Sequence, residues 1–200
     1  MNRYRLLIAG FGLMMATVPC LPAQNHRAEV FGGYSYAKIN PEANNPKENA
    51  HGWMGGAAGY ANKWVGAGFE IAGQFGNMAT PGGAPPVSFK EYSYLVGPQF
   101  RFVSTRKVEA GVKLLLGGVF GQARLDSNTT AGQAQVLSAA GYSNFDSTKF
   151  AMMVGFPVDV TVTKLVGLRV EPGWYRTSFI NQHQSNFRFS VGPVFRFGGQ

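Results

Sequence analysis

The sequence predicts an all-β protein, an eight-stranded antiparallel up-and-down transmembrane β-barrel, and three observations support this fold class. Eight segments alternate apolar residues with small or charged ones at period two, as strands with two unlike faces do. The connections between these segments alternate between short and long. The composition is unusual for a water-soluble enzyme, because 27 of the 200 residues are Gly and only 14% are charged, while 45% are hydrophobic.

Residues 1–23 are predicted to be a secretory signal peptide, which leaves residues 24–200 as the barrel domain. Two arginines in Met1–Arg5 precede the uncharged apolar run Leu6–Val18, and Ala23 offers a small residue for cleavage. The run is too short for a membrane-spanning helix, which needs about 20 residues. Lipidation of Cys20 is disfavoured because a proline precedes it. Cleavage after Ala23 would remove the only cysteine, so the mature chain is expected to lack disulfides and Cys metal sites.

The first four predicted strands are Ala28–Ile39, Gly52–Asn62, Trp64–Gly76 and Ser88–Phe102. The first has a weak division between its faces, and the second is so rich in Gly and Ala that its faces are poorly resolved. The third sets large apolar residues against Gly, Glu and Gln. The fourth has an apolar, aromatic face opposite a face of small and charged residues. Each is long enough to cross a bilayer, since a tilted spanning strand needs about 9–11 residues.

The last four predicted strands are Val108–Leu125, Lys149–Val162, Leu165–Phe179 and Asn186–Phe197. The fifth alternates Val and Leu with Glu, Gly and Lys. The sixth sets Phe, Met and Val against small residues and one Asp, and the seventh alternates Val, Leu and Trp with Gly, Arg and Glu. The eighth carries Phe on one face and Arg on the other. All four therefore have one face suited to lipid or a core and one that is different.

The lengths of the connections indicate how the strands are arranged. Strands two and three, four and five, and six and seven are joined by tight turns at 62–63, 103–107 and 163–164. The other four connections, 38–50, 77–87, 126–148 and 180–185, are mostly long and rich in Pro, Gly or Asn. In an up-and-down barrel this alternation places all short turns at one end and all long loops at the other.

The many glycines are expected to make room for charged side chains inside a narrow barrel, since eight strands enclose an interior that side chains fill. Six acids and five bases are assigned to the inward face, and their near balance favours pairing because an unpaired buried charge is costly. We therefore expect an interior filled by salt bridges and no open aqueous pore. The inward charges are Glu29, Glu70, Glu91, Arg101, Glu109, Lys113, Asp159, Arg169, Glu171, Arg188 and Arg196.

Three segments, Ala28–Ile39, Tyr92–Phe102 and Asn186–Phe197, give the chain a resemblance to a known family. With them it resembles the small bacterial outer-membrane β-barrel proteins, the OmpA-like or outer membrane protein beta-barrel domain group, over nearly the whole mature chain. The resemblance implies an assembly signal of alternating aromatics in the last strand, read by the barrel-insertion machinery. Phe187, Phe189, Phe195 and Phe197 match that signal, although Gly198, Gly199 and Gln200 follow the last aromatic residue.

No catalytic, cofactor-binding or metal site is predicted. His26, His51 and His183 are isolated and have no metal-ligand spacing. No nucleophile elbow, phosphate-binding loop or nucleotide fingerprint occurs. The basic residues are dispersed, which favours contact with anionic lipid headgroups over nucleic acid despite a pI of about 9.8.

The predicted function is that of an integral protein of the bacterial outer membrane with a mainly structural or surface-interaction role, and not an enzyme. Its expected partners are outer-membrane lipid, the barrel-insertion machinery and an unidentified surface ligand of the long loops, with 126–148 as the main contact region. The alternative is a secreted, soluble lipocalin-like barrel that binds a hydrophobic ligand. That barrel would have apolar residues inside and polar residues outside.

Overall fold

The computed structural model of the chain describes residues 27–39, 48–78, 87–105, 107–124, 145–179 and 182–198. The predicted signal peptide and the central parts of the four long connections lie outside the described residues. No helix among the described residues is long and apolar enough to cross a membrane.

The described residues form an all-β structure of antiparallel strands, as the alternation predicts. The strands are β1 (Arg27–Ile39), β2 (Glu48–Tyr60), β3 (Val65–Met78), β4 (Val87–Ser104), β5 (Val108–Arg124), β6 (Phe145–Gly155), β7 (Val158–Thr161), β8 (Val166–Phe179) and β9 (Gln182–Phe197). β6 and β7 follow one another along a single path across the barrel, so the wall contains eight spanning strands.

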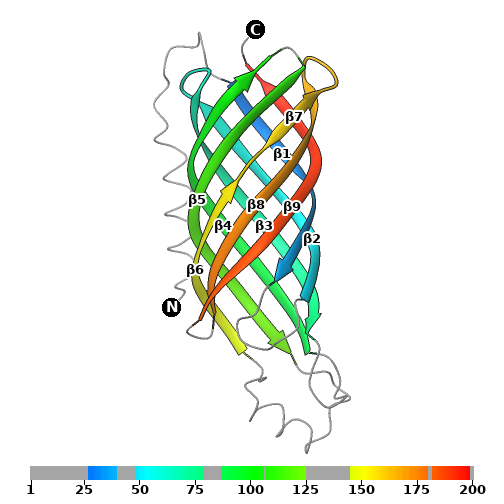
Figure 1. Ribbon diagram of the computed structural model, residues 1–200, viewed down its shortest axis with the longest axis vertical. Coiled ribbons are helices and arrows are strands. Elements are labelled where there is room, and N and C mark those ends of the chain that lie inside the picture. Colours follow the sequence, from blue (N-terminus) through cyan, green and yellow to red (C-terminus); the bar gives the residue numbers. More distant parts are fainter. Residues whose placement is uncertain are drawn as a thin grey trace, which may run out of the picture.

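The sheet closes into a barrel because each strand pairs with its neighbours along the chain and the first strand pairs with the last. β1 lies between β2 and β9, and pairing of β4 with β5 completes the ring. The tilted strands surround a narrow interior, with the short turns at the upper end in Figure 1 and the ends of the long connections at the other. The prediction of an eight-stranded up-and-down barrel is confirmed.

Side chains of Asn and Thr hold the three short turns. Asn62 Oδ1 accepts hydrogen bonds from the backbone of Trp64 at 2.8 Å and Val65 at 2.9 Å, just before β3. Thr105 and Thr163 serve the same purpose before β5 and β8, with their hydroxyls 3.0 Å from the backbone nitrogens of Val108 and Val166. Short polar side chains of this kind mimic a backbone turn, so each tight turn has a local cause in the sequence.

The strands reach further towards the long-connection end than the alternation indicated. β1 and β2 pair as far as Ile39 with Glu48, inside the predicted connection 38–50. β6 begins at Phe145 and β9 at Gln182, several residues before the predicted starts at 149 and 186. Backbone hydrogen bonds between strands do not depend on side-chain polarity, so polar residues can continue a strand beyond the apolar belt. The alternation of apolar and polar residues therefore ends before the strand does.

The predicted sixth strand, Lys149–Val162, is divided into β6 and β7 by two prolines. Phe156 donates its backbone N–H to Pro172 O at 2.9 Å, and Gly111 donates to Pro157 O at 3.0 Å. The return bond in each pair needs an N–H that proline lacks. The register of β5 and β8 nevertheless continues unchanged across the gap, from Gly155 to Val158.

The outer face of the barrel is apolar. Large hydrophobic side chains are exposed on every spanning strand, among them Val30, Trp53, Ile71, Val96, Leu116, Phe150, Leu168 and Phe195. Aromatic residues occur towards both ends, with Trp64 in a short turn and Trp174 and Phe187 in the part of β8 and β9 nearer the long connections. The inner face carries nearly all of the buried polar side chains, so polarity is reversed relative to a water-soluble barrel.

Candidate functional site

The candidate functional site is the interior of the barrel, where the structure places all eleven of the charged residues assigned to the inward face. Ten of them are buried, and Arg196 has 13% of its side chain exposed at the short-turn end. They come from seven of the eight spanning strands, because successive inward positions on each strand point to the same lumen. Two separate groups of ion pairs result, with one acid left over.

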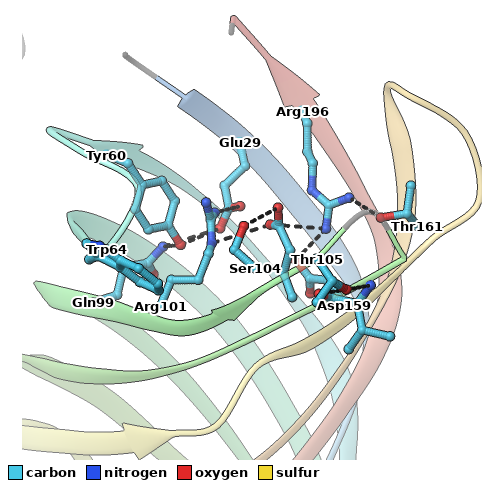
Figure 2. Close-up of polar contacts among 12 residues, drawn as sticks. Glu29, Tyr60, Trp64, Gln99, Arg101, Ser104, Thr105, Asp159, Thr161 and Arg196 are labelled. Atoms are coloured by element: carbon cyan, nitrogen blue, oxygen red, sulfur yellow. Dashed lines mark hydrogen bonds and ion pairs between the residues drawn. The ribbon is translucent and has the colours of Figure 1, made fainter. Parts of the chain in front are cut away.

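The first group, here called the six-charge cluster, lies inside the short-turn end of the barrel and is drawn in part in Figure 2. It consists of Glu29, Glu109 and Asp159 with Arg101, Arg169 and Arg196. Three acids and three bases make the cluster electrically neutral. Every member contacts at least one residue of opposite charge within 4.0 Å.

Arg169 is the centre of the six-charge cluster. Its Nε lies 2.7 Å from Asp159 Oδ1 and its Nη2 lies 2.9 Å from Asp159 Oδ2, a bidentate pair. The same Nη2 lies 2.7 Å from Glu29 Oε1. Arg196 approaches Asp159 at 3.1 Å and also bonds to Thr161 Oγ1 at 3.0 Å. The planar guanidinium is suited to this arrangement because it offers several donors in one plane.

Arg101 joins the cluster from the opposite wall. Its Nη2 lies 3.4 Å from Glu29 Oε2 and its Nε lies 3.3 Å from Glu109 Oε2. Its guanidinium also stacks 3.9 Å above the ring of Tyr60. Tyr60 and Gln99 complete the surroundings of Glu29, since the Tyr60 hydroxyl donates at 3.3 Å and Gln99 Nε2 at 3.2 Å to Glu29 Oε1. Glu29 is therefore enclosed by two arginines and two neutral donors.

The second group, here called the four-charge cluster, consists of Glu70 and Glu171 with Lys113 and Arg188. Lys113 bridges the two acids, contacting Glu70 and lying 2.7 Å from Glu171 Oε1. Arg188 also contacts Glu70 and lies 3.8 Å from Glu171 Oε1. All four side chains are at most 1% exposed. Two acids and two bases again give a neutral group, as burial in a medium of low polarity requires.

Glu91 is the one inward charge without an ion pair among the described residues. It is 8% exposed and lies nearer the long-connection end, where Tyr175 contacts it and Arg188 interacts with it electrostatically. The inward face has one more acid than bases, and Glu91 is the acid that remains without an ion pair among the described residues. Gln74 lies directly opposite Glu91 on β3 and places its Nε2 2.7 Å from Ser35 Oγ.

Apolar and aromatic side chains fill the space around the charges. Phe31 separates the two clusters, with its ring 4.4 Å from the Arg169 guanidinium and 5.1 Å from Lys113 Nζ. Beyond the four-charge cluster, Leu95, Leu115, Val119, Ala151, Met153 and Tyr175 pack together. Two cavities next to the six-charge cluster, one beside Tyr60 and one beside Phe31, have volumes of about 10 Å³ each, which is room for about one water molecule.

Tyr60 is a member of the site that the sequence reasoning missed. It belongs to β2, whose Gly- and Ala-rich sequence left the two faces unresolved. The signal was available in the short turn, because Tyr60 pairs with Gly66, an inward position of β3. Gln99 was placed on the inward face but not recognised as part of the site, because a neutral amide among many charges has no distinctive pattern.

The aromatic residues assigned to the assembly signal are on the outer face. Phe187, Phe195 and Phe197 are 50%, 44% and 54% exposed, and Phe189 is half-buried. His51 is also outside, where the Tyr34 hydroxyl contacts its Nδ1. In the described part of the chain, no group of three or more His, Cys, Asp or Glu residues is close enough to hold a metal ion. His26 lies outside the described residues, and the side chain of His183 is not described.

Comparison with solved structures identifies the same architecture in bacterial surface proteins. Ail, the attachment invasion locus protein of Yersinia pestis, has a TM-score of 0.60 at 15% identity, covering 87% of this chain and all of Ail. Neisserial surface protein A has a TM-score of 0.62 at 16% identity, covering 85% of this chain and 97% of that protein. Ail has also been crystallised with the heparin analogue sucrose octasulfate, and that structure matches with a TM-score of 0.58.

No family model matches the sequence, and no curated protein matches it. At 15–16% identity the likeness concerns the fold alone. The chain therefore has the fold of the small eight-stranded outer-membrane β-barrels of bacteria.

Proposed function

We propose that this chain is an integral protein of the bacterial outer membrane with a structural or surface-interaction role. The observation that carries the proposal is the reversed polarity of the barrel, with large apolar side chains exposed on every strand and the charges buried inside. An apolar exterior of this extent is unstable in water but favourable in lipid. A barrel also pairs all of its strand edges, which is the condition for crossing a membrane as a sheet.

The interior is proposed to be closed to solutes larger than water. Support comes from the two neutral ion-pair clusters, which extend across the lumen, and from the small size of the two cavities described beside Tyr60 and Phe31, about 10 Å³ each. Opening a path would separate buried charges from their partners, at a cost of several kcal/mol per broken pair. The role of the barrel would then be to anchor and display its loops.

The alternative of a soluble lipocalin-like barrel is less well supported. Such a barrel needs an apolar cavity for its ligand and a polar exterior. Here the inner face holds eleven charged side chains, and the residues exposed on the outer face are mainly Phe, Trp, Tyr, Val, Leu and Ile. We therefore do not favour a hydrophobic ligand inside this barrel.

A surface-interaction role is suggested by the similarity to Ail, an attachment protein that has been crystallised with a heparin analogue. In this chain the long connections would be the contact regions. The segment 126–148 is the longest of them and is rich in Ser, Thr, Asn and Gln. It lies mostly outside the described residues.

Cell fractionation tests the location. The outer-membrane fraction of a strain that makes the protein should contain it, and its band should migrate differently on a gel with and without boiling, as a closed barrel resists detergent until heated. Recovery from the soluble periplasmic or secreted fraction, with no heat-dependent shift, would overturn the proposal. A periplasmic binding protein should be followed in the same gels as a marker of leakage.

Planar-bilayer conductance tests the closed interior separately. The purified protein should produce no large, stable channel openings in 1 M KCl, whereas a general porin measured in parallel should. The double variant Lys113→Ala/Arg188→Ala removes both bases of the four-charge cluster and should show noisier, transient openings if it inserts. Large stable openings in the unmodified protein would contradict the closed interior but not the membrane location.

A further inference from the structure

Acidic and basic side chains are distributed unequally between the inner and outer faces of the barrel. All six acids whose side chains the structure describes are buried in the interior. On the outer face and turns, every described charged side chain is basic: Lys38, Lys63, Lys90, Lys107, Arg124, Lys149, Lys164 and Arg176. The interior, with six acids and five bases, is nearly neutral, so the excess of positive charge among the described side chains lies on the outer face and the turns.

Two of these basic residues lie close together on the lipid-facing surface, near the long-connection end. Lys38 of β1 is directly opposite Phe187 of β9, which is directly opposite Trp174 of β8. Arg176 is two residues further along β8 and points to the same face as Trp174. Two strand spacings and two residues along the strand separate the Cα atoms of Lys38 and Arg176 by roughly 12 Å. Both side chains are long enough to reach one ligand between them.

These two bases have no acidic partner among the described residues. Lys38 is exposed and Arg176 is half-buried, and neither makes an ion pair there. Their neighbours on the same face are aromatic, with Phe187 50% and Trp174 37% exposed. Unpaired bases that adjoin the apolar outer face need an anion at that level, because a charge beside hydrocarbon is costly without one. Aromatic rings of this kind favour the headgroup region.

Building on the proposed membrane location, we propose that Lys38 and Arg176 form a binding site for the phosphate of an anionic lipid headgroup, with Trp174 and Phe187 against the upper part of its acyl chains. Lys supplies a mobile point charge and Arg a planar pair of donors, both of which bind phosphate oxygens. The occupant is a membrane lipid and not a soluble anion, because both side chains belong to the outer face of strands that continue directly into the apolar belt.

Fluorescence quenching by brominated lipid measures this binding. Trp174 is made the only tryptophan by Trp53→Phe and Trp64→Phe, and the protein is reconstituted in phosphatidylcholine vesicles containing brominated phosphatidic acid. The expected preference for phosphatidic acid over brominated phosphatidylcholine is on the order of tenfold at low salt, since each basic residue near a membrane surface favours anionic lipid by a few-fold. High salt should reduce it.

The double variant Lys38→Gln/Arg176→Gln should reduce the preference to about one. The matched control Lys63→Gln/Lys164→Gln removes two bases from the short turns at the other end and should retain the wild-type preference. Equal preference in the first variant and in the unmodified protein would overturn the inference. So would a soluble sulfated oligosaccharide that binds through Lys38 and Arg176 while phosphatidic acid does not.

The same samples separate failure of this inference from failure of the proposed function. A protein that inserts in vesicles and shows the heat-dependent gel shift, but has no preference for phosphatidic acid, contradicts only the lipid site. A protein that fails to insert at all contradicts the membrane location as well. Each variant is scored for the gel shift before its lipid preference is measured.

Discussion

Each buried charge in this barrel depends on a small number of named neighbours. Glu70 contacts both bases of its cluster, and all three side chains are at most 1% exposed, so water cannot readily replace either base. Removing one member of a buried ion pair costs more than the pair contributes, because the remaining charge is left without a partner. Replacing a carboxylate that has ion pairs should therefore lower the free energy of unfolding more than replacing one that has none.

Glu70→Gln should destabilise the folded barrel by about 3–5 kcal/mol, because Lys113 and Arg188 would then share only Glu171. The free energy of unfolding can be measured by urea titration of the protein in lipid vesicles, followed by tryptophan fluorescence. Glu91→Gln is the matched control: it removes a buried carboxyl group that has no ion pair among the described residues, and should be neutral or stabilising. Equal destabilisation by the two variants would contradict the pairing described here.

Gly155 illustrates the need for small residues inside the wall. A Cβ at this position would lie 2.7 Å from Lys113 Cε and 3.0 Å from Glu171 Oε1, so a methyl group would displace the four-charge cluster. Gly155→Ala is expected to cost about 1–3 kcal/mol in the same urea titration. Gly59→Ala is the control, since a Cβ there meets nothing within 4 Å and should be neutral or slightly stabilising.

The inward glycines differ in what a side chain at each position would meet, and not all of them make room for charged groups. The alternation predicts that inward glycines make room for charged side chains, which is true of Gly155. Gly33 and Gly192 have a different role, because a Cβ on Gly33 would lie 2.1 Å from Val191 O and one on Gly192 would lie 2.0 Å from Gly32 O. These two glycines permit the close approach of β1 and β9 where the barrel closes.

Pro172 of β8 interrupts the hydrogen bonding between β8 and the neighbouring strand. Pro172→Ala would place a new N–H opposite the backbone carbonyl of Phe156, between β6 and β7, where proline leaves the return hydrogen bond unmade. The new hydrogen bond should stabilise the folded barrel by about 1 kcal/mol. Loss of the proline makes the unfolded chain more flexible, which should lower the free energy of unfolding by about 0.4–1 kcal/mol. We therefore expect little change in stability but slow exchange of the new amide hydrogen, as measured by NMR. Exchange of that amide within minutes would contradict the continuous register of β6 and β8.

At the scale of the whole molecule, much of the architecture could be predicted because alternation and connection length are local properties. Alternation alone indicates all eight spanning strands, and it places Glu91 and Arg101 on one face of β4 without reference to any partner. The partners themselves could not be predicted. Glu29 and Arg169 are 140 residues apart, and they meet only because the stagger of the strands places them at the same height, which no single strand encodes.

The aromatic residues of β9 provide a prediction for the whole chain during assembly. Phe195→Ser/Phe197→Ser should lower the amount of protein that reaches the outer membrane in cells, because these residues are proposed to be read by the insertion machinery. Refolding of the purified variant into vesicles should be less affected. The control Phe100→Ser/Phe102→Ser removes two similarly exposed aromatics from β4. If both pairs reduce assembly equally, the last strand has no special role.

Pairing of β1 with β9 also has a consequence for the timing of folding. The chain can satisfy its first strand only after its last strand has been synthesised and delivered. Until then β1 has an open edge, and Glu29 lacks its contact with Arg169. A chain that lacks β9 therefore keeps unpaired backbone N–H and C=O groups on β1, and the barrel can close only when every strand from β1 to β9 is present.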